Sequence, residues 1–81
     1  MTVDPGTYRH WKGLQYLVLG LGHDANDAER TAVVYLPLYP VDGPPFAVRT
    51  LADFTAWVDA TTGAVVAAGD RGAVPRFERL S

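Results

Sequence analysis

Hydrophobic residues recur along the chain in short runs that turns containing glycine or proline separate, a pattern typical of β-strands. Residues 7–11 are rich in β-favouring side chains, and residues 14–21 are apolar at almost every position. Between these segments, Lys12-Gly13 predicts a tight turn, because glycine reaches positive φ at little steric cost. A helix is the competing interpretation of residues 14–21, but the glycines on both sides favour a strand. The two segments are therefore expected to form a β-hairpin.

Three further segments extend this pattern. Residues 22–30 are polar and predict a turn, whereas residues 31–36 are largely apolar and predict the next strand. The prolines within residues 37–45 predict a stiff loop, because proline donates no hydrogen bond to a strand ladder. Residues 46–49 predict a short strand beyond that loop.

The apolar spacing becomes helical after Thr50, which is a favoured N-cap residue. Leu51, Phe54 and Val58 recur at i, i+3 and i+7, a stripe that suits the packing of one helix face on a sheet. A helix is therefore predicted over residues 51–59.

The C-terminal part of the chain predicts a loop and a last strand. Residues 64–72 are small and glycine-rich, with a short strand at residues 65–66, and residues 75–80 form a closing strand with Phe77 inward. This order of elements predicts a mainly β fold with one helix, arranged as a small curled sheet or partly open barrel. Residues 1–81 are expected to form a single domain, because a chain of this length is too short for two independent cores.

The amino-acid composition is typical of a packed domain, and it makes some classes of binding partner less favoured than others. Hydrophobic residues make up 48% of the chain, and without cysteine its stability must come from apolar packing. Seven basic and nine acidic residues give a formal net charge of -2, without the basic excess typical of nucleic-acid-binding proteins. The longest apolar stretch, residues 17–21, is far shorter than a membrane span, and the first residues lack the pattern of a secretion signal. A cytoplasmic location without membrane association is therefore expected.

Several motifs are more specific than the strand pattern. They are GTYRHWKGLQYLVLG at residues 6–20, VVYLPLY at residues 33–39, FAVRTLADF at residues 46–54 and the pair Arg76-Phe77. Their order and content resemble a small bacterial family, domain of unknown function 1653, over almost the whole chain. The resemblance implies an SH3-like barrel and implies no activity. The chain departs from the family pattern at Thr50, where proline is usual, and in a longer segment over residues 61–74.

Aromatic and cationic side chains gather in the first predicted strand and in two later segments. A strand that alternates such residues can hold an anion or stack on a planar ligand. Arg49 and Arg76 would strengthen the anion hypothesis if barrel closure brought them beside that strand. The alternative is an ordinary sheet face on which Trp11 packs in the core and the cations are solvated or paired. The candidate ligand-binding residues are Tyr8, Arg9, His10, Lys12, Tyr35, Tyr39 and Arg49.

Two other segments give weaker signals. Tyr35 and Tyr39 flank a Leu-Pro-Leu run, and an aromatic groove of this kind can dock a proline-rich peptide. The alternative places both rings at the rim of the core, with their hydroxyl groups in water. Residues 23–29 offer oxygen ligands but lack the calcium-loop pattern, so a solvated turn is expected. With two histidines and no cysteine, neither a metal site nor a cofactor is predicted.

Catalytic chemistry has few candidate residues in this sequence. The only serine is Ser81, and neither a Gly-x-Ser-x-Gly motif nor a phosphate-binding glycine loop occurs. His10 could form an acid–base pair with Asp24 or Glu29, but no sequence pattern places these residues together. An enzyme is therefore the least favoured of the alternative functions.

The function predicted from these observations is a non-catalytic binding module. It would recognise an anionic or planar group of a nucleotide, RNA or protein partner through its aromatic and basic face. The alternative is a structural homodimer that assembles through an exposed strand edge or an apolar face.

Overall fold

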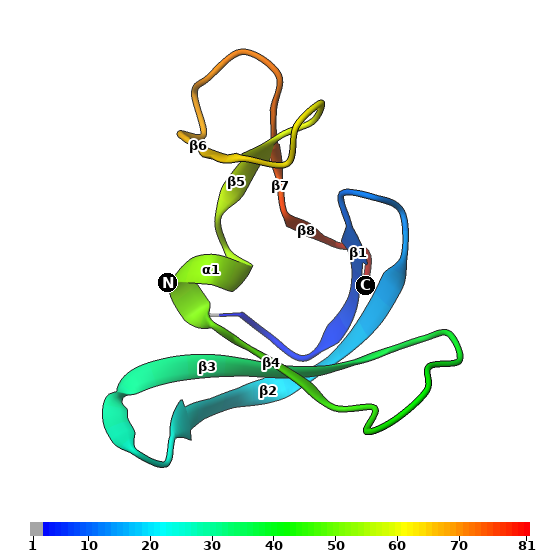
Figure 1. Cartoon of the computed structure of the whole chain (residues 1–81), viewed down its shortest axis with the longest axis vertical. Helices are drawn as coiled ribbons and strands as arrows, with labels where there is room; N and C mark the ends of the chain where they lie inside the picture. Colours follow the sequence, from blue (N-terminus) through cyan, green and yellow to red (C-terminus); the bar gives the residue numbers. More distant parts are fainter. Residues whose placement is uncertain (1–2) are drawn as a thin grey trace.

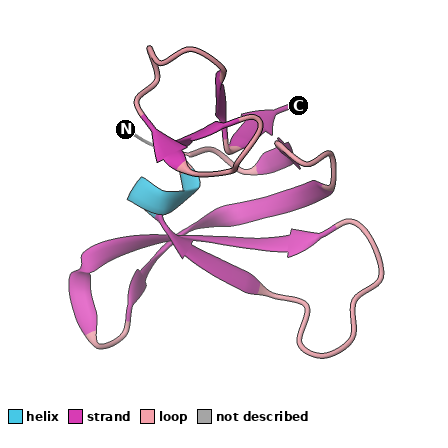
Figure 2. Ribbon diagram, turned by 45° about the horizontal axis from the view of Figure 1, so that its top comes forward, coloured by secondary structure: helices cyan, strands magenta, loops and turns pink. Residues whose placement is uncertain are grey.

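The computed structural model describes residues 3–81. These residues form two antiparallel sheets and one short helix (Figure 1, Figure 2). The larger sheet has five strands in the order β4-β3-β2-β1-β8, and the smaller sheet has three in the order β6-β5-β7. The elements are β1 (Gly6–His10), β2 (Gln15–Asp24), β3 (Asp27–Pro37), β4 (Ala47–Thr50), α1 (Leu51–Phe54), β5 (Trp57–Asp59), β6 (Val65–Val66), β7 (Ala73–Pro75) and β8 (Phe77–Arg79).

The first two strands form the predicted hairpin. β1 and β2 pair antiparallel with Tyr8 opposite Tyr16, and the connecting turn contains Gly13 at a left-handed φ of 107°. A side chain would be strained at that φ, so the turn favours glycine. The main-chain N–H of Gly13 donates to the carbonyl of His10 at 2.7 Å and closes the turn. The expected strand is confirmed, and the competing interpretation of residues 14–21 as a helix is excluded.

Residues 22–30 are mostly strand, which corrects the prediction of a turn over this segment. β2 continues to Asp24, β3 begins at Asp27, and the side chain of Asp24 accepts the N–H of Asn26 at 2.8 Å. A strand ladder is built from main-chain hydrogen bonds, which exposed polar side chains do not disturb. The turn is therefore confined to the tip of a long hairpin, which projects from the rest of the fold in Figure 1.

The helix is also shorter than predicted, because α1 comprises Leu51–Phe54 and not residues 51–59. Thr50 does cap it, since its hydroxyl oxygen accepts the N–H of Asp53 at 3.2 Å. The chain then extends again, and Trp57–Asp59 pairs with β6 on one side and β7 on the other. These two neighbouring strands provide hydrogen-bond partners for the main-chain groups of β5. This tertiary pairing outweighs the helical spacing of the apolar residues in the sequence. Nowhere in residues 3–81 does a helix reach the length and apolar character needed to cross a membrane.

The core combines aromatic rings with branched aliphatic side chains. Phe54 and Phe77 stack with their ring centroids 4.1 Å apart, and Tyr8 and Tyr35 each meet Phe54 edge-on at 5.5 Å. The inward orientation predicted for Phe77 is confirmed, because its side chain is buried in this cluster. The buried members of the core are Val3, Tyr8, Val18, Val33, Tyr35, Phe54 and Phe77.

The predicted fold class, mainly β with one helix and only partly closed, is confirmed. The two sheets curve round the core without closing into a barrel (Figure 2). The predicted closing strand is divided, because β7 joins the smaller sheet, β8 joins the larger one, and Arg76 lies between them. The main-chain N–H of Arg76 donates to Ala56 and its carbonyl accepts the N–H of Trp11, each at 2.9 Å. Arg76 therefore links the two sheets beside the end of β1.

Candidate anion-binding site

A pocket of about 440 Å³ opens where the two sheets meet. It lies between the turn after β1, the loop after β5 and the junction of β7 with β8, three segments that are far apart in the sequence. None of the described residues that line it is acidic, and several are basic or carry hydroxyl groups. The lining therefore offers positive charge and hydrogen-bond donors. Its residues are His10, Trp11, Lys12, Arg49, Thr61, Thr62, Gly63 and Arg76.

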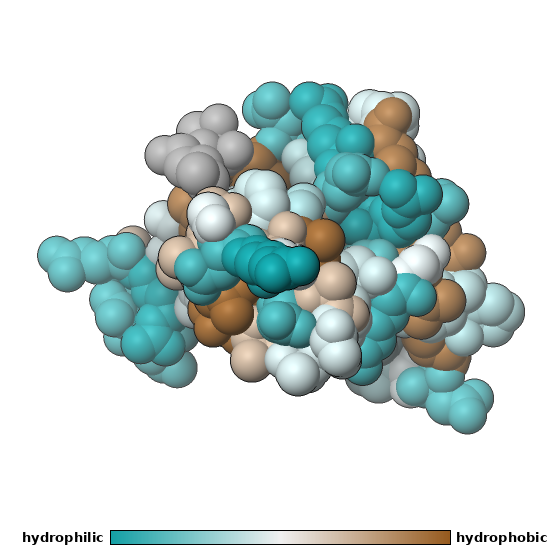
Figure 3. Space-filling model, turned by 90° about the horizontal axis from the view of Figure 1, so that it is seen from above, coloured by the Kyte–Doolittle hydropathy of each residue, from teal (hydrophilic) through white to brown (hydrophobic). Residues whose placement is uncertain are grey.

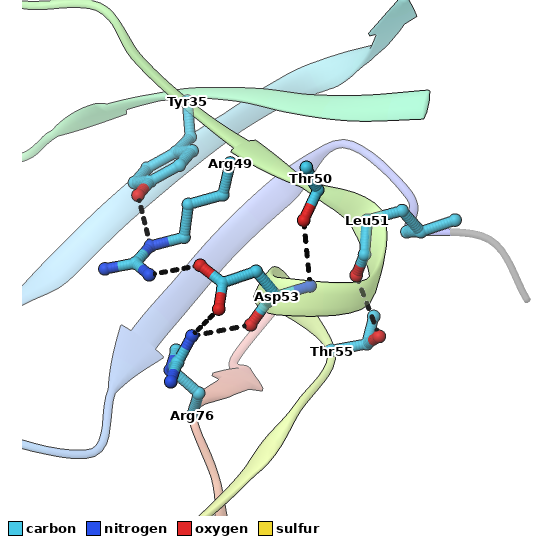
Figure 4. A network of polar contacts seen from close by, with 7 residues as sticks. All are labelled: Tyr35, Arg49, Thr50, Leu51, Asp53, Thr55 and Arg76. Carbon is cyan, nitrogen blue, oxygen red and sulfur yellow. Dashed lines mark hydrogen bonds and ion pairs between the residues drawn. The ribbon is translucent and has the colours of Figure 1, made fainter. Parts of the chain in front are cut away.

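Asp53 holds the two arginines of the pocket in place. Nη1 of Arg49 donates to one carboxylate oxygen of Asp53 at 2.7 Å, and Nη1 of Arg76 donates to the other and to the main-chain carbonyl. Nε of Arg49 also donates to the hydroxyl oxygen of Tyr35 at 2.9 Å. Figure 4 shows the carboxylate between the two guanidinium groups. Because Asp53 lies on α1, which Thr50 caps, one helical turn positions both cations.

The ionisation states in this cluster favour a charged network. Partial burial raises the pKa of Asp53, but the hydrogen bonds from Arg76 and Arg49 outweigh this effect and hold that pKa below its usual value. Burial likewise lowers the pKa of Arg49, and its hydrogen bonds to Asp53 and Tyr35 more than compensate, so that this pKa is raised. At neutral pH the two arginines are protonated and the single carboxylate is ionised. The cluster therefore carries a net positive charge.

His10 adds a ring whose pKa is lowered from its ordinary value. Partial burial is the main cause, and the positive charges of Arg49, Lys12 and Arg76 lower this pKa further. Nδ1 of His10 accepts the main-chain N–H of Lys12 at 3.2 Å. The neutral ring therefore carries its proton on Nε2, which makes Nε2 a hydrogen-bond donor at neutral pH.

Trp11 and the loop after β5 form another part of the pocket wall. The N–H groups of Thr61 and Thr62 donate to the carboxylate of Asp59 at 2.7 and 3.0 Å, which lowers the pKa of Asp59 and shapes the loop. Gly63 follows with a left-handed φ of 77°, and a Cβ atom there would lie 2.9 Å from the indole of Trp11. Glycine is therefore favoured by both the backbone and the close approach, and the indole packs directly on the loop.

Three of the predicted ligand-binding residues, His10, Lys12 and Arg49, come together at this pocket. Tyr8 lies in the core instead, with only 7% of its surface exposed, and its hydroxyl group donates to the carbonyl of Asp4 at 2.9 Å. Tyr35 is also buried, and its hydroxyl oxygen serves the pocket indirectly by accepting from Arg49. These two tyrosines therefore belong to the core that supports the site.

Arg9 and Tyr39 are absent from the pocket lining. Arg9 alternates with Tyr8 and His10 along β1 and pairs with the exposed Glu78 at 2.7 Å. Tyr39 shares a hydrogen bond of 2.7 Å with Tyr16, and burial together with this bond raises the pKa of Tyr16 to about 12. Both predicted residues therefore interact with other side chains of the protein.

Two parts of the lining were missed by sequence reasoning, namely the loop over residues 61–63 and Trp11 as a pocket wall. Trp11 was not among the candidate ligand-binding residues, and the alternative interpretation placed it in the core, whereas it is half-buried beside the pocket. For the loop, the sequence did carry a signal, because the run Asp-Ala-Thr-Thr-Gly at residues 59–63 favours an Asx turn. No local pattern, however, places that turn beside β1.

Neither a metal cluster nor an acid–base pair is formed in the described part of the chain. No group of three His, Cys, Asp or Glu side chains within residues 3–81 is arranged to hold a metal ion. Over the same residues, His10 makes no ion pair or hydrogen bond with a carboxylate. The pocket is thus a donor-rich recess rather than a ligand set for a cation.

Known proteins of the same fold agree with this architecture. A crystal structure of a DUF1653 protein from Bordetella bronchiseptica is 34% identical in sequence to this chain and has a TM-score of 0.79. The similarity covers 98% of this chain and 88% of that chain. No curated protein matches the chain significantly. The sequence profile described as "Protein of unknown function (DUF1653)" matches residues 6–79, and the chain therefore belongs to the DUF1653 family.

Proposed function

We propose that this protein is a non-catalytic binding module that recognises an anionic group in the pocket between its two sheets. The observation that carries the proposal is the lining of this pocket, which includes His10, Lys12, Arg49 and Arg76 and, among the described residues, no acidic side chain. A cleft lined by one sign of charge concentrates ligands of the opposite sign. The whole chain has a formal net charge of -2, so this positive character is local.

The arginines are ordered before a ligand arrives, which supports a binding role. The side chain of Arg76 is only 11% exposed and is held by the carboxylate and carbonyl oxygens of Asp53. Arg49 is held by the same carboxylate and by Tyr35. Fixing a long side chain during binding costs conformational entropy, and a preorganised side chain avoids most of that cost. We therefore expect the arginines to supply much of the affinity.

The chemistry of the lining supports binding over catalysis. Thr61 and Thr62 carry its hydroxyl groups, and within residues 3–81 neither hydroxyl is hydrogen-bonded to a histidine. The carboxylate of Asp59 lies beside Thr62, but hydrogen bonds from Thr61 and Thr62 lower its pKa, which makes it a weak base. Nucleophilic catalysis requires a base within hydrogen-bond reach of the nucleophile. His10 uses Nδ1 to accept a main-chain N–H, so it is oriented as a donor toward other groups. We therefore expect the ligand to be bound without chemical change.

An NMR titration tests the proposal with inorganic phosphate, nucleotides, a short RNA and a proline-rich peptide as probes. The phosphate-containing probes are expected to shift the amide signals of Trp11, Lys12 and residues 61–63, because these groups border the pocket. The amides at the tip of the β2–β3 hairpin are expected to stay unchanged. The proposal fails if no probe perturbs the pocket, or if the shifts are as large on the opposite face of the molecule.

Two arginine variants separate binding in the pocket from a general effect of charge. Arg76→Met is expected to weaken phosphate binding by about 10-fold or more, because a charge-assisted hydrogen bond contributes about 1.5–3 kcal/mol. Arg9→Met removes the same charge outside the pocket and is expected to leave the affinity nearly unchanged, since solvent and salt screen distant exposed charges. Calorimetric titration of both variants measures the difference. Equal losses would contradict a local site.

A second candidate function is homodimer formation through the outer face of the five-stranded sheet. Leu17, Val34, Leu36 and Val48 alternate with core residues along their strands, and cross-strand pairing joins Leu17 to Leu36 and Val34 to Val48. They therefore share the side of the sheet turned away from the core. Val48 is 64% exposed. By contrast, the face seen in Figure 3 carries small hydrophobic areas among hydrophilic ones.

Light scattering over a range of concentrations tests the homodimer. If the outer face self-associates, the measured mass rises with concentration from the 8.8 kDa of one chain toward twice that value. Val48→Lys places a charge on that face, on the edge strand β4, and is expected to keep the protein monomeric, because an unpaired charge is costly to bury. A constant monomer mass for the unmodified protein would remove this candidate and leave the binding module unaffected.

A further inference from the structure

We propose that the ligand of this pocket is a mononucleotide, in which a phosphate monoester binds the cationic end and the attached base stacks on Trp11. This inference rests on the proposed function and adds the chemical class of the ligand. It combines three features of the pocket, namely the unused donors of its arginines, its size and its aromatic wall.

Both arginines keep hydrogen-bond donors after their internal hydrogen bonds are made. Arg49 uses Nε and Nη1, and Arg76 uses Nη1, so that among residues 3–81 Nη2 of each guanidinium has no hydrogen-bond partner. Lys12 and Nε2 of His10 add donors from the β1 side of the pocket. A carboxylate has two oxygens and one charge, whereas a terminal phosphate presents three acceptor oxygens and nearly two charges. Donors that converge from β1, β4 and the β7–β8 junction suit the phosphate better.

The volume of the pocket indicates the size of its ligand. The pocket measures about 440 Å³, within the range of about 300–1,000 Å³ that is typical of sites for small organic ligands. A phosphate ion would fill only a small part of this volume. The ligand therefore carries a sizeable group beside its phosphate.

The aromatic part of the pocket lining indicates the nature of that group. The indole of Trp11 lines the pocket, packs on Gly63 and has Nζ of Lys12 5.4 Å from its centroid. Lys12 is exposed and flexible, so it can leave the indole for the phosphate and make room for a planar ring. Stacking of a nucleobase on an aromatic side chain is favourable for every base. Thr61 and Thr62 add hydroxyl groups on the same wall, which suit the hydroxyl groups of a ribose.

Fluorescence of Trp11 provides a direct test. The chain has two tryptophans, so a Trp57→Phe variant leaves Trp11 as the only indole and keeps an aromatic ring in β5. Titration of this variant with AMP, ribose 5-phosphate, inorganic phosphate and adenosine is expected to show quenching by AMP at the lowest concentration. We expect AMP to bind about 10-fold more tightly than ribose 5-phosphate, because only AMP can stack. Calorimetry on the unmodified protein gives the same comparison if Trp57→Phe does not fold.

A second variant assigns the difference to Trp11. Trp11→Leu is expected to retain ribose 5-phosphate binding and to lose most of the 10-fold preference for AMP. Equal affinities of the unmodified protein for AMP, ribose 5-phosphate and inorganic phosphate would overturn the mononucleotide and leave the anion site intact. Binding of adenosine as tight as that of AMP, or no binding of any phosphate compound, would overturn the anion site as well. An RNA oligonucleotide that binds more tightly than AMP would overturn the mononucleotide in favour of a polymeric ligand.

Discussion

Truncation of Phe54 to alanine is expected to lower the free energy of unfolding by about 3–5 kcal/mol, the range typical of a buried phenylalanine. Phe54 is 2% exposed, and its ring stacks on Phe77 with centroids 4.1 Å apart while Tyr8 and Tyr35 meet it edge-on. Alanine would leave a cavity bordered by three rigid rings that cannot collapse into it. The loss would therefore include both the transfer energy of the ring and the cost of the cavity.

This loss is large relative to the stability of so small a domain. At about 0.05–0.15 kcal/mol per residue, a chain of 81 residues is stable by roughly 4–12 kcal/mol. Phe54→Ala would thus leave the protein marginally folded or unfolded at 25 °C, and chemical denaturation followed by circular dichroism measures the change. Phe46→Ala is the matched control, because Phe46 is 63% exposed and should change stability by about 0.5 kcal/mol or less. A loss below about 1 kcal/mol for Phe54→Ala would contradict the packing of this core.

The strands of the larger sheet were predictable because their signals are local. The turn at Lys12-Gly13 and the apolar run after it specify the first hairpin without reference to the rest of the chain. The same local rules failed over residues 22–30, since exposed polar side chains are compatible with both a turn and the end of a long hairpin. The turn-forming residues thus located the tip of the hairpin correctly, but they predicted a turn that is too long.

The length of the helix was not predictable from local spacing. Leu51, Phe54 and Val58 do all face the interior, but Phe54 belongs to the core of the larger sheet and Val58 is buried in β5. Two successive elements with inward side chains produce the same apolar spacing as one longer helix. Only the pairing of β5 with β6 and β7, which depends on residues up to 18 positions later, separates the two interpretations.

In the candidate site, too, some residues could be identified from the local sequence, whereas the placement of others depends on tertiary contacts. His10, Lys12 and Arg49 were identified because cationic residues beside aromatic ones indicate anion binding. Tyr8 and Tyr35 were included for the same reason, and their hydroxyl groups proved to bond inside the protein. A tyrosine can bury its ring when its hydroxyl group finds a partner, and the identity of that partner is tertiary information. The loop over residues 61–63 reaches the pocket through the smaller sheet, which no sequence pattern indicated.

Asp53 connects the stability of the fold to the arrangement of the pocket. Its main-chain N–H donates to the hydroxyl oxygen of the N-cap Thr50, and its carboxylate and carbonyl oxygens accept hydrogen bonds from Arg49 and Arg76. Arg76 in turn belongs to the junction of the two sheets through its main chain. Loss of the Asp53 charge would leave two guanidinium groups close together without a counter-ion, and repulsion between them would strain both the junction and the pocket.

Asp53→Asn is therefore expected to lower the free energy of unfolding by about 1.5–3 kcal/mol at pH 7, the range for hydrogen bonds to a charged group. The carboxylate is 45% exposed, so solvent screening places the expected value in the lower part of that range. The pKa of Asp53 is held below its usual value of 3.8, which means that the unfolded chain takes up this proton first as the pH falls. The stabilisation from Asp53 is thus complete above about pH 5 and disappears as the pH falls through the pKa of the folded state.

Denaturation curves at pH 7, 4 and 2 test this dependence. The difference in stability between the unmodified protein and Asp53→Asn is expected to be largest at pH 7, smaller at pH 4 and smaller still at pH 2. Glu78→Gln is the matched control, because Glu78 on the edge strand β8 pairs with Arg9 of β1 at the same 2.7 Å but both side chains are about half exposed. An exposed pair of this kind contributes about 0–1 kcal/mol. A difference for Asp53→Asn that stays constant from pH 7 to pH 2 would show that the charge of Asp53 does not hold the arginines, and that its contribution is packing alone.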